Sequence, residues 1–193
     1  TTDIYTLSLH DALPIYQPYY TSQTTFEPRY YQRNAVNRTL DAIAKGQQRL
    51  LIVMSTGTGK TYTAFQIVYR LLKSGMKKKI LYLADRNILV DQSMQQDFAP
   101  LEKTIHKINF AKDDPVTITS HEVYFSLYQQ LTDREEDAED VGGEDEAISR
   151  LSALFQKDFF DLIIVDECHR GSAKKDSNWR KILDRKSTRL NSS

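Results

Sequence analysis

The chain is poor in the residues that mark several protein classes. Its 193 residues include one cysteine, seven glycines and five prolines, and no long uninterrupted apolar run. The single cysteine, Cys168, excludes an internal disulfide and is typical of a reducing compartment. A membrane-spanning helix needs about 20 apolar residues, so we expect a cytoplasmic protein with no membrane partner.

A net charge of one sign is also absent, because 26 basic residues balance 26 acidic ones. The charges are unevenly placed: residues 133–146 hold nine acids and one arginine, a local charge of −8 that leaves +8 on the rest of the chain. A basic body of this kind suits a phosphate-backbone partner such as DNA. The acidic segment is typical of a solvated surface loop.

A phosphate-binding loop is predicted at residues 54–61, Met-Ser-Thr-Gly-Thr-Gly-Lys-Thr. It lies between a strand-like apolar run and a helical pattern, which is the context that such a loop needs. Gly57 and Gly59 let the backbone bring its N–H groups close to phosphate oxygens. Lys60 supplies a cation for the phosphates, and the Thr61 hydroxyl is placed to ligate Mg²⁺. Met54 stands where the first glycine is usual, so a glycine-rich turn that binds nothing remains the alternative.

An acidic pair follows a short apolar run at residues 161–165. Such a run predicts a buried strand, which would deliver Asp166 and Glu167 at its carboxyl end, where ligands bind in an open α/β sheet. Asp166 would hold Mg²⁺, and Glu167 would orient or deprotonate the attacking water. The alternative is an ordinary solvated turn.

The hydrophobic pattern alternates between strands and helices from residue 27 onward. Strands are predicted at residues 49–54, 79–84, 116–119 and 161–165, with a weaker candidate at 107–110; helices are predicted at 27–45, 60–73, 87–98, 121–131 and 147–155. This alternation, with strands rich in β-branched residues, predicts an α/β fold: a parallel sheet with helices on both faces, in three layers.

Both ends of the chain differ in character from the rest. The first fifteen residues and the last nine resemble translated sequencing-adapter read-through, and a signal peptide is rejected because acidic residues interrupt any apolar core. We therefore predict a non-native or disordered segment at 1–25, one domain at 26–184 and a non-native or disordered tail at 185–193.

Smaller polar groups add candidates for ligand contact. Gln32, about twenty residues before the phosphate loop, carries an amide that can pair with the N6/N7 edge of adenine. Arg86 follows one predicted strand, and Thr119 and Ser120 follow another. At the sheet edge they would suit contacts with a DNA backbone. Ordinary helix caps explain such residues equally well.

The order of these motifs resembles the first RecA-like domain of superfamily 2 helicases and translocases. The resemblance runs through Gln32, residues 55–61, Leu83-Ala-Asp-Arg-Asn87, Ile118-Thr-Ser120 and the Asp166-Glu-Cys-His169 box. The continuation Arg170-Gly171 and Ser177-Asn-Trp-Arg180 looks more narrowly like the motor (restriction) subunit of type I restriction enzymes.

The resemblance implies an ATP- and Mg²⁺-dependent motor acting on double-stranded DNA, alongside methylation and specificity subunits. It implies an adenine-reading Gln32, a nucleotide-binding loop, magnesium ligands Thr61 and Asp166, the catalytic base Glu167, and a His169 that couples hydrolysis to motion. The nucleotide-binding loop would comprise Ser55, Thr56, Gly57, Thr58, Gly59, Lys60 and Thr61.

The chain would then be a single, incomplete motor domain that lacks a second RecA-like domain and its arginine finger. Two alternatives remain open. One is another superfamily 2 helicase, of the repair or type III restriction kind. The other is a nucleotide-binding module without catalysis, which the water-activating position of Glu167 disfavours.

Overall fold

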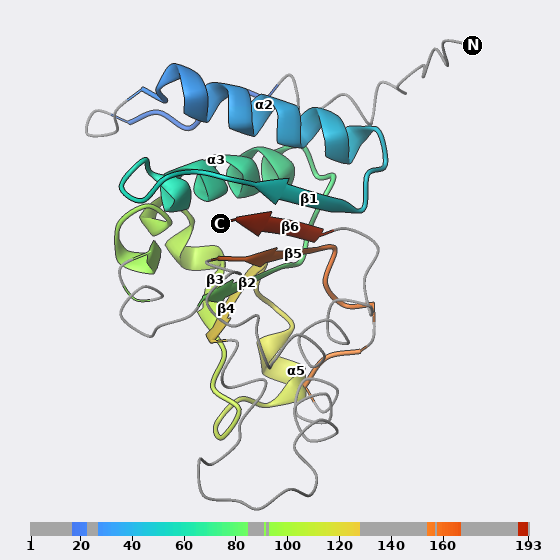
Figure 1. Cartoon of the computed structure of the whole chain (residues 1–193). Coiled ribbons are helices and arrows are strands. Elements are labelled where there is room, and N and C mark those ends of the chain that lie inside the picture. The colour runs from blue at the N-terminus through green and yellow to red at the C-terminus, as the bar shows by residue number, and fades with distance from the viewer. Residues whose placement is uncertain are drawn as a thin grey trace, which may run out of the picture.

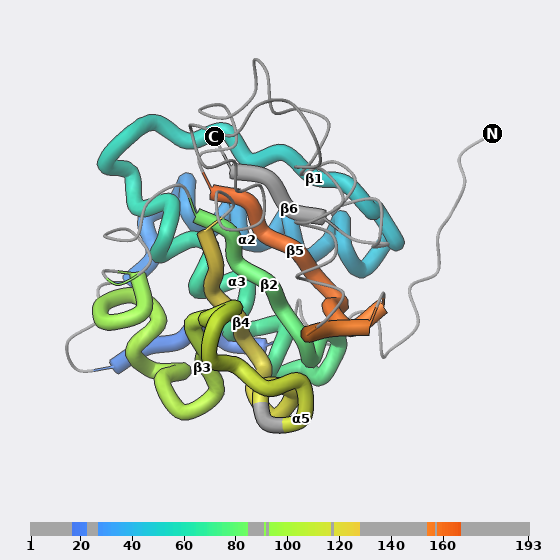
Figure 2. The backbone as a smooth tube through the Cα atoms, turned by 90° about the horizontal axis from the view of Figure 1, so that it is seen from below, coloured from blue at the N-terminus to red at the C-terminus, as the bar shows by residue number. Residues whose placement is uncertain are grey.

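Six parallel strands form one sheet at the centre of the protein, in the order β1-β6-β5-β2-β4-β3 (Figures 1 and 2). The computed structural model describes residues 17–22, 27–84, 91, 93–127, 154–156, 158–166 and 189–192. The strands are β1 (Arg49–Ile52), β2 (Ile80–Ala84), β3 (Ile105–Lys107), β4 (Val123–Leu127), β5 (Leu162–Val165) and β6 (Arg189–Ser192).

The register of the central strands brings their carboxyl ends to one edge of the sheet. Ile80 of β2 pairs with Val123 of β4 on one side and with Leu162 of β5 on the other, so these three strands start level. In a parallel sheet this shared edge is where loops from several strands can meet around a ligand. The loop after β1 and the residue after β5 both lie at this edge.

The central strands are buried on both faces, as expected for a parallel sheet covered by helices. All residues of β2, β4 and β5 are buried. Ile80, Tyr82 and Ala84 belong to the core on the side of α2 and α3, whereas Leu81 and Leu83 belong to a second core on the opposite face. Because side chains alternate along a strand, one short sequence supplies both layers of the core.

The helices are α2 (Tyr30–Ala44), α3 (Lys60–Lys73), the 3₁₀ helix η1 (Ala99–Thr104) and α5 (Pro115–Ile118). Figure 1 shows α2 and α3 stacked on one side of the sheet and α5 on the other. Phe65 on α3 packs edge to face with Phe98, which in turn packs on Phe125 of β4. The predicted three-layer α/β architecture is therefore confirmed.

Two predicted elements are wrong. Residues 116–119, expected as a strand, lie largely in helix α5, and the expected helix at 121–131 is strand β4 over Val123–Leu127. Asp114 explains the first error. It precedes Pro115, the first residue of the helix, and its side chain accepts a hydrogen bond from the Val116 amide at 3.2 Å, as the capping residue of a helix does. The second error came from a short aromatic and β-branched run that suits a buried strand better than a helix.

The remaining predicted elements agree with the structure to within a few residues where it describes them. The first two expected helices and the strands at 49–54, 79–84 and 161–165 are present, and the weaker candidate is displaced to Ile105–Lys107. The expected helix at 87–98 is helical at residue 91 and over 93–95. The rest of it before residue 96, most of the helix at 147–155, and the acidic loop at 133–146 lie outside the described residues.

The chain ends contribute more to the fold than we expected from the sequence. Tyr20 packs edge to face on Phe65 and Tyr69, with centroid distances of 5.5 and 5.2 Å. Its backbone exchanges two hydrogen bonds with the amide of Gln66, at 2.9 and 3.1 Å. Residues 17–22 thus pack against α3, and the domain start at residue 26 stays a prediction.

A strand lies within residues 185–193, which we predicted to be a non-native or disordered tail. Residues 189–192 form β6, which pairs with β1 on one side and β5 on the other. This strand therefore separates the strand of the phosphate loop from the strand that carries Asp166.

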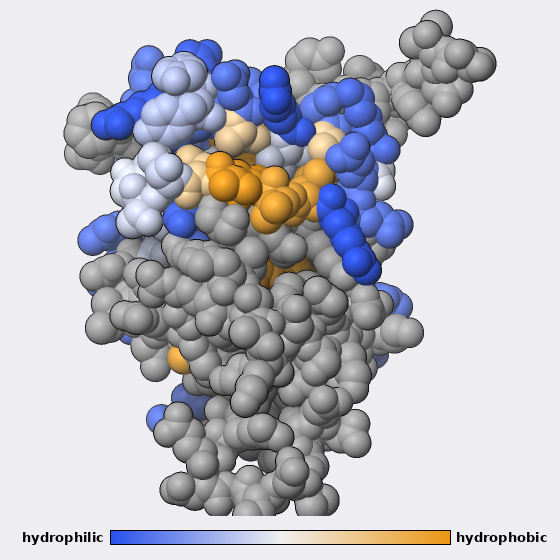
Figure 3. All heavy atoms as spheres, in the orientation of Figure 1, coloured by the Kyte–Doolittle hydropathy of each residue, from blue (hydrophilic) through white to orange (hydrophobic). Residues whose placement is uncertain are grey.

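Strand β1 forms an edge of the sheet, and part of its apolar surface is open. Leu51 is 64% exposed and Val53, just beyond the strand, is 74% exposed. Figure 3 shows apolar side chains gathered below the hydrophilic surface of α2.

Within the described parts of the chain, no helix has the length and apolar character needed to span a bilayer.

Candidate nucleotide-binding site

The loop between β1 and α3 has the backbone conformation that the sequence predicted for phosphate binding. Gly57 and Gly59 have φ angles of +78° and +80°, a left-handed region that residues with a Cβ rarely adopt. The Thr58 side chain donates a hydrogen bond to the Ser55 carbonyl at 2.6 Å, closing the turn. The loop is thus held in a tight conformation by its own residues.

Gly59 is also required by a close approach of another element. A Cβ at this position would lie 2.5 Å from Nε2 of Gln32, far inside the normal contact distance. Gln32 belongs to α2, and its side-chain amide would have to move if residue 59 carried a Cβ. The sequence suggested a glycine for phosphate contact, but it did not reveal this second reason.

Helix α3 begins directly after Gly59 and presents its amino end to the loop. The first backbone bond of the helix runs from the Thr63 amide to the Gly59 carbonyl at 2.9 Å, and the Thr63 hydroxyl donates to the same oxygen at 2.9 Å. The amides of the first helical turn therefore have no acceptor within the helix. Together with the helix dipole they favour an anion at this end.

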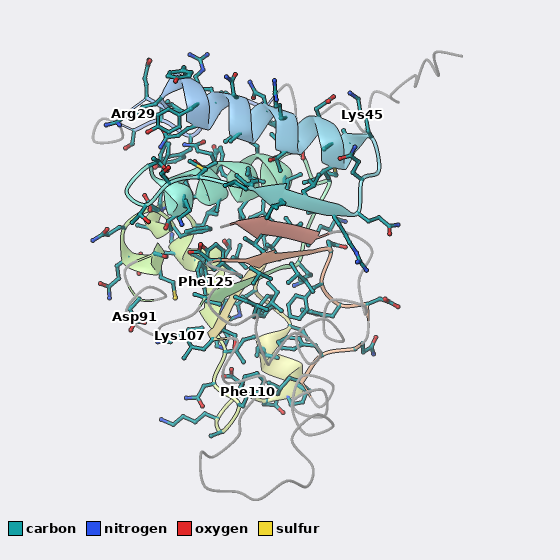
Figure 4. All side chains as sticks on the ribbon, viewed as in Figure 1. Arg29, Lys45, Asp91, Lys107, Phe110 and Phe125 are labelled. Atoms are coloured by element: carbon teal, nitrogen blue, oxygen red, sulfur yellow. The ribbon has the colours of Figure 1, made fainter. Side chains whose placement is uncertain are left out.

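The Gln32 side chain links the start of α2 to the phosphate loop through two hydrogen bonds. Its side-chain oxygen accepts the Arg29 amide at 2.9 Å, and its Nε2 donates to the Thr58 carbonyl at 2.9 Å. Each amide atom can make one further hydrogen bond, so the pairing with adenine that we predicted remains chemically open. Figure 4 labels Arg29 at this end of α2 and Lys45 at the other.

Asp166 lies at the carboxyl end of β5, where the sequence predicted it, and it is 7% exposed. Its amide donates to the Leu83 carbonyl at 2.9 Å, which fixes the residue beside β2. The Tyr82 hydroxyl donates to the Asp166 carboxylate at 3.0 Å. A buried hydroxyl of β2 therefore holds the carboxylate that the sequence predicted as a magnesium ligand.

Burial raises the pKa of Tyr82 well above its ordinary value, and the charge of Asp166 raises it further. The hydroxyl therefore stays protonated and can act as a donor to the carboxylate. Tyr82 was not among the predicted site residues. The signal available in the sequence was a polar-tipped aromatic in an otherwise aliphatic strand, Ile-Leu-Tyr-Leu-Ala.

A cavity of about 610 Å³ opens beside the loop. It is lined by Gln32, Gly57, Thr58 and Gly59, which the sequence predicted. It is also lined by residues that the sequence did not single out: Glu27, Arg29, Tyr31, Tyr62, Gln96 and Asp97. Burial raises the pKa of Asp97. These residues come from three separate parts of the chain, so no local motif could have identified them together.

Some of the other predicted site residues lie in or beside the loop, and others lie outside the described residues. Ser55 and Thr56 lie in the exposed loop, and Lys60 is the first residue of α3 and half-buried. Arg86, Glu167 and His169 lie outside the described residues. The groups that the structure places together are therefore the loop, the start of α3, Gln32 and Asp166.

Thr119 and Ser120 do not lie at the edge of the sheet where we expected them. They follow helix α5 and precede β4, and the Lys79 ammonium donates to the Thr119 carbonyl at 2.5 Å at the amino end of β2. The nucleotide cavity lies at the opposite, carboxyl edge. The strand assignment that placed these two residues beside Arg86 was wrong, and the argument for their contact with DNA loses its basis.

The residues present fit an Mg²⁺–nucleotide ligand. A left-handed glycine loop and a helix amino end suit phosphate oxygens, and a hydroxyl and a carboxylate are oxygen ligands of the kind that Mg²⁺ prefers. Within the described ranges no group of three or more His, Cys, Asp or Glu side chains could bind a metal without such help. Mg²⁺ is usually held by one or two protein groups plus substrate phosphates, and this arrangement matches that pattern.

Known proteins similar to this chain include subunits of restriction enzymes. Residues 25–191 match the family described as "Type III restriction enzyme, res subunit". The chain is 50% identical over 170 residues to the type I restriction enzyme EcoAI endonuclease subunit of Escherichia coli, which covers 88% of this chain and 19% of that protein. It is 35% identical over 147 residues to the EcoKI endonuclease subunit of E. coli strain K12, covering 74% and 12% of the two chains.

Solved structures give the same picture. A fragment assigned as an HsdR subunit of a type I restriction enzyme from Vibrio vulnificus YJ016 superposes with a TM-score of 0.66 at 31% identity, covering 97% of this chain and 29% of that one. The UvsW helicase of bacteriophage T4 has the same fold, with a TM-score of 0.60 at 21% identity, over 95% of this chain and 58% of its own. The chain therefore spans only part of its relatives. By sequence it belongs to the family "Type III restriction enzyme, res subunit".

Proposed function

We propose that the chain is the ATP-binding motor domain of a DNA translocase, and that its parent protein is the restriction subunit of a type I restriction-modification enzyme. The observation that carries the proposal is the meeting of the glycine loop, the start of α3 and Asp166 at one edge of the sheet. The 50% identity to a type I endonuclease subunit supports the choice of subunit.

In this proposal each part of the site has a separate task. Lys60 and the amides of the loop hold the phosphates, while Thr61 and Asp166 hold Mg²⁺, which neutralises the charge that develops on the transferred phosphoryl group. Gln32 reads the adenine from the cavity wall. Glu167 activates the attacking water, and His169 couples hydrolysis to movement. Glu167 and His169 lie within three residues of Asp166 in the sequence.

The partners follow from the same proposal. They are double-stranded DNA, the methylation and specificity subunits of the complex, and a second RecA-like domain. Arg86 remains our predicted contact with the DNA backbone. A phosphate contact of this kind would be weakened by salt and insensitive to DNA sequence.

The proposal is tested by titrating the chain with a fluorescent ATP analogue, with Mg²⁺ and with EDTA. We expect weak binding that Mg²⁺ strengthens and that is lost in Lys60→Ala, because Lys60 interacts with the phosphates in the ground state. We also expect slow turnover, since an arginine finger supplied by a partner domain is worth roughly 10³–10⁵ in rate.

Lys73→Ala is a matched control, because Lys73 lies at the far end of the same helix. It should bind the analogue as the unmodified chain does. Equal binding by Lys60→Ala and Lys73→Ala would contradict the assignment of the loop. Turnover near that of complete motors would instead indicate a self-sufficient enzyme.

A further inference from the structure

Tyr82 carries the one polar side chain of β2 that lies in the core beside α3, and its hydroxyl is buried at the proposed magnesium site. Its ring is stacked on Phe125 with a centroid distance of 4.8 Å and packs edge to face on Phe98 at 5.6 Å. The residue is 1% exposed. Because close packing on both sides fixes the ring, the position of its oxygen is set by the sheet.

The hydrogen bond between Tyr82 and Asp166 has a defined direction. A carboxylate can only accept, so the single phenolic proton goes to Asp166, 3.0 Å away. The bond runs from β2 to the residue that directly follows β5.

This direction matters for a cation. The carboxylate that receives the Tyr82 proton is held in one orientation. A buried phenol of β2 thus orders the side chain of the residue that follows β5, 84 positions away in sequence.

We propose that Tyr82 is a positioning residue for the magnesium site, whose hydroxyl orients the Asp166 side chain for Mg²⁺. The inference rests on the proposed function, since it needs Asp166 to hold the cation. Tyr82 touches neither the nucleotide nor the metal in this role. Groups that orient metal ligands typically change metal affinity by about 10–100-fold when they are removed.

The test is Tyr82→Phe, which keeps the packed ring and removes only the oxygen. A fluorescent ATP analogue is titrated into the 193-residue chain at a series of Mg²⁺ concentrations and in EDTA. We expect the Mg²⁺ concentration for half-maximal binding to rise by about tenfold. Binding in EDTA should not change, because the phosphates still meet the loop and Lys60.

Tyr124→Phe is the matched control. The Tyr124 hydroxyl is also in the interior, where it donates to the carbonyls of Ile118 and His121 at 2.7 and 2.8 Å. It lies in the core on the opposite face of the sheet and contacts neither Thr61 nor Asp166. Tyr124→Phe should lower the melting temperature as a lost buried hydrogen bond does, and it should leave the Mg²⁺ midpoint unchanged.

Asp166→Asn supplies a second readout. If Tyr82 acts through this carboxylate, adding Tyr82→Phe to Asp166→Asn should shift the Mg²⁺ midpoint much less than Tyr82→Phe does alone. Full additivity would overturn the inference, and so would an unchanged midpoint in Tyr82→Phe or an equal loss of binding in EDTA. An unmodified chain whose nucleotide binding ignores Mg²⁺ would instead overturn the proposed function, and this inference with it.

Discussion

At the scale of single residues, two features favour glycine at position 59: the access of phosphates to the backbone and the closeness of the Gln32 side chain. The pattern predicted a glycine because phosphates need close access to the backbone, and the left-handed φ of +80° agrees. The structure adds that Gln32 fills the space where a Cβ would be. A residue that looks purely functional therefore also controls how α2 meets the loop.

Gly59→Ala should lower stability by about 1–2 kcal/mol through the left-handed backbone alone. Displacement of Gln32 should add to this loss and abolish binding of a fluorescent ATP analogue. Gly46→Ala is the control, since Gly46 has a φ of +78° but no atom within 4 Å of the place that a Cβ would occupy. Denaturant unfolding should show a larger loss for Gly59→Ala than for Gly46→Ala. Equal losses would mean that the contact with Gln32 has no energetic weight.

Local patterns predicted the loop residues well and the partners of the site poorly. Gly57, Gly59 and Thr61 lie within one short motif whose spacing carries its own chemistry. Tyr82 and Asp97 reach the same site from β2 and from the segment before η1. Their roles depend on which strands become neighbours, and that information is not present in any short stretch of sequence.

At the scale of elements, the starts of β2 and β5 are tied by one carboxylate. Asp161 accepts hydrogen bonds from the amides of Lys78 and Lys79, at 2.9 and 3.1 Å. The Asp161 amide in turn donates to the Lys79 carbonyl at 2.7 Å. This contact aligns two parallel strands that cannot be joined by a hairpin. It therefore helps to set the register that brings Asp166 to the site.

Asp161→Ala should destabilise the fold by about 1–3 kcal/mol, because two backbone donors lose a charged acceptor. Asp161→Asn should cost less, since the amide oxygen can still accept both bonds. Asp41→Ala is a surface control that removes an ion pair with Lys45 on α2, whose side chains are 43% and 44% exposed. Its expected cost is about 0.5 kcal/mol or less. Chemical denaturation measures all three, and an Asp161→Ala effect no larger than the surface control would contradict the role of the tie.

The elements that the sequence predicted wrongly were short ones. The run from Val116 to Thr119 is β-branched, so propensity favoured a strand, yet Asp114 and Pro115 provide the start of a helix. Four residues are too few for periodicity to decide between the two structures. Longer elements such as α3 were predicted with the correct bounds because their apolar pattern extends over several turns.

At the scale of the whole molecule, the core has two apolar layers on either side of one sheet, and the beginning of the chain completes the outer layer. Tyr19 and Tyr20 pack against the core formed by α2, α3 and the sheet. The Arg70 guanidinium lies over the Tyr19 ring at 4.7 Å, and Gln66 is fully buried beneath Tyr20. The composition of the first fifteen residues gave no indication that residues 17–22 pack against α3.

We therefore expect two deletions at this end to behave differently. Removal of residues 1–15, which resemble adapter read-through, should leave the melting temperature unchanged. Removal of residues 1–22 should cost about 3 kcal/mol. The buried Gln66 amide would lose both hydrogen bonds to Tyr20, and Phe65 and Tyr69 would lose an edge-to-face partner.

Gln66→Leu separates the two contributions to this loss. Leucine removes the amide that would be left unsatisfied, so the longer deletion should cost less in this background than in the unmodified chain. Thermal and denaturant unfolding of the four proteins measures the difference. If the longer deletion were as stable as the shorter one, residues 17–22 would contribute nothing to folding. In that case the domain would begin near residue 26, as the sequence alone suggested.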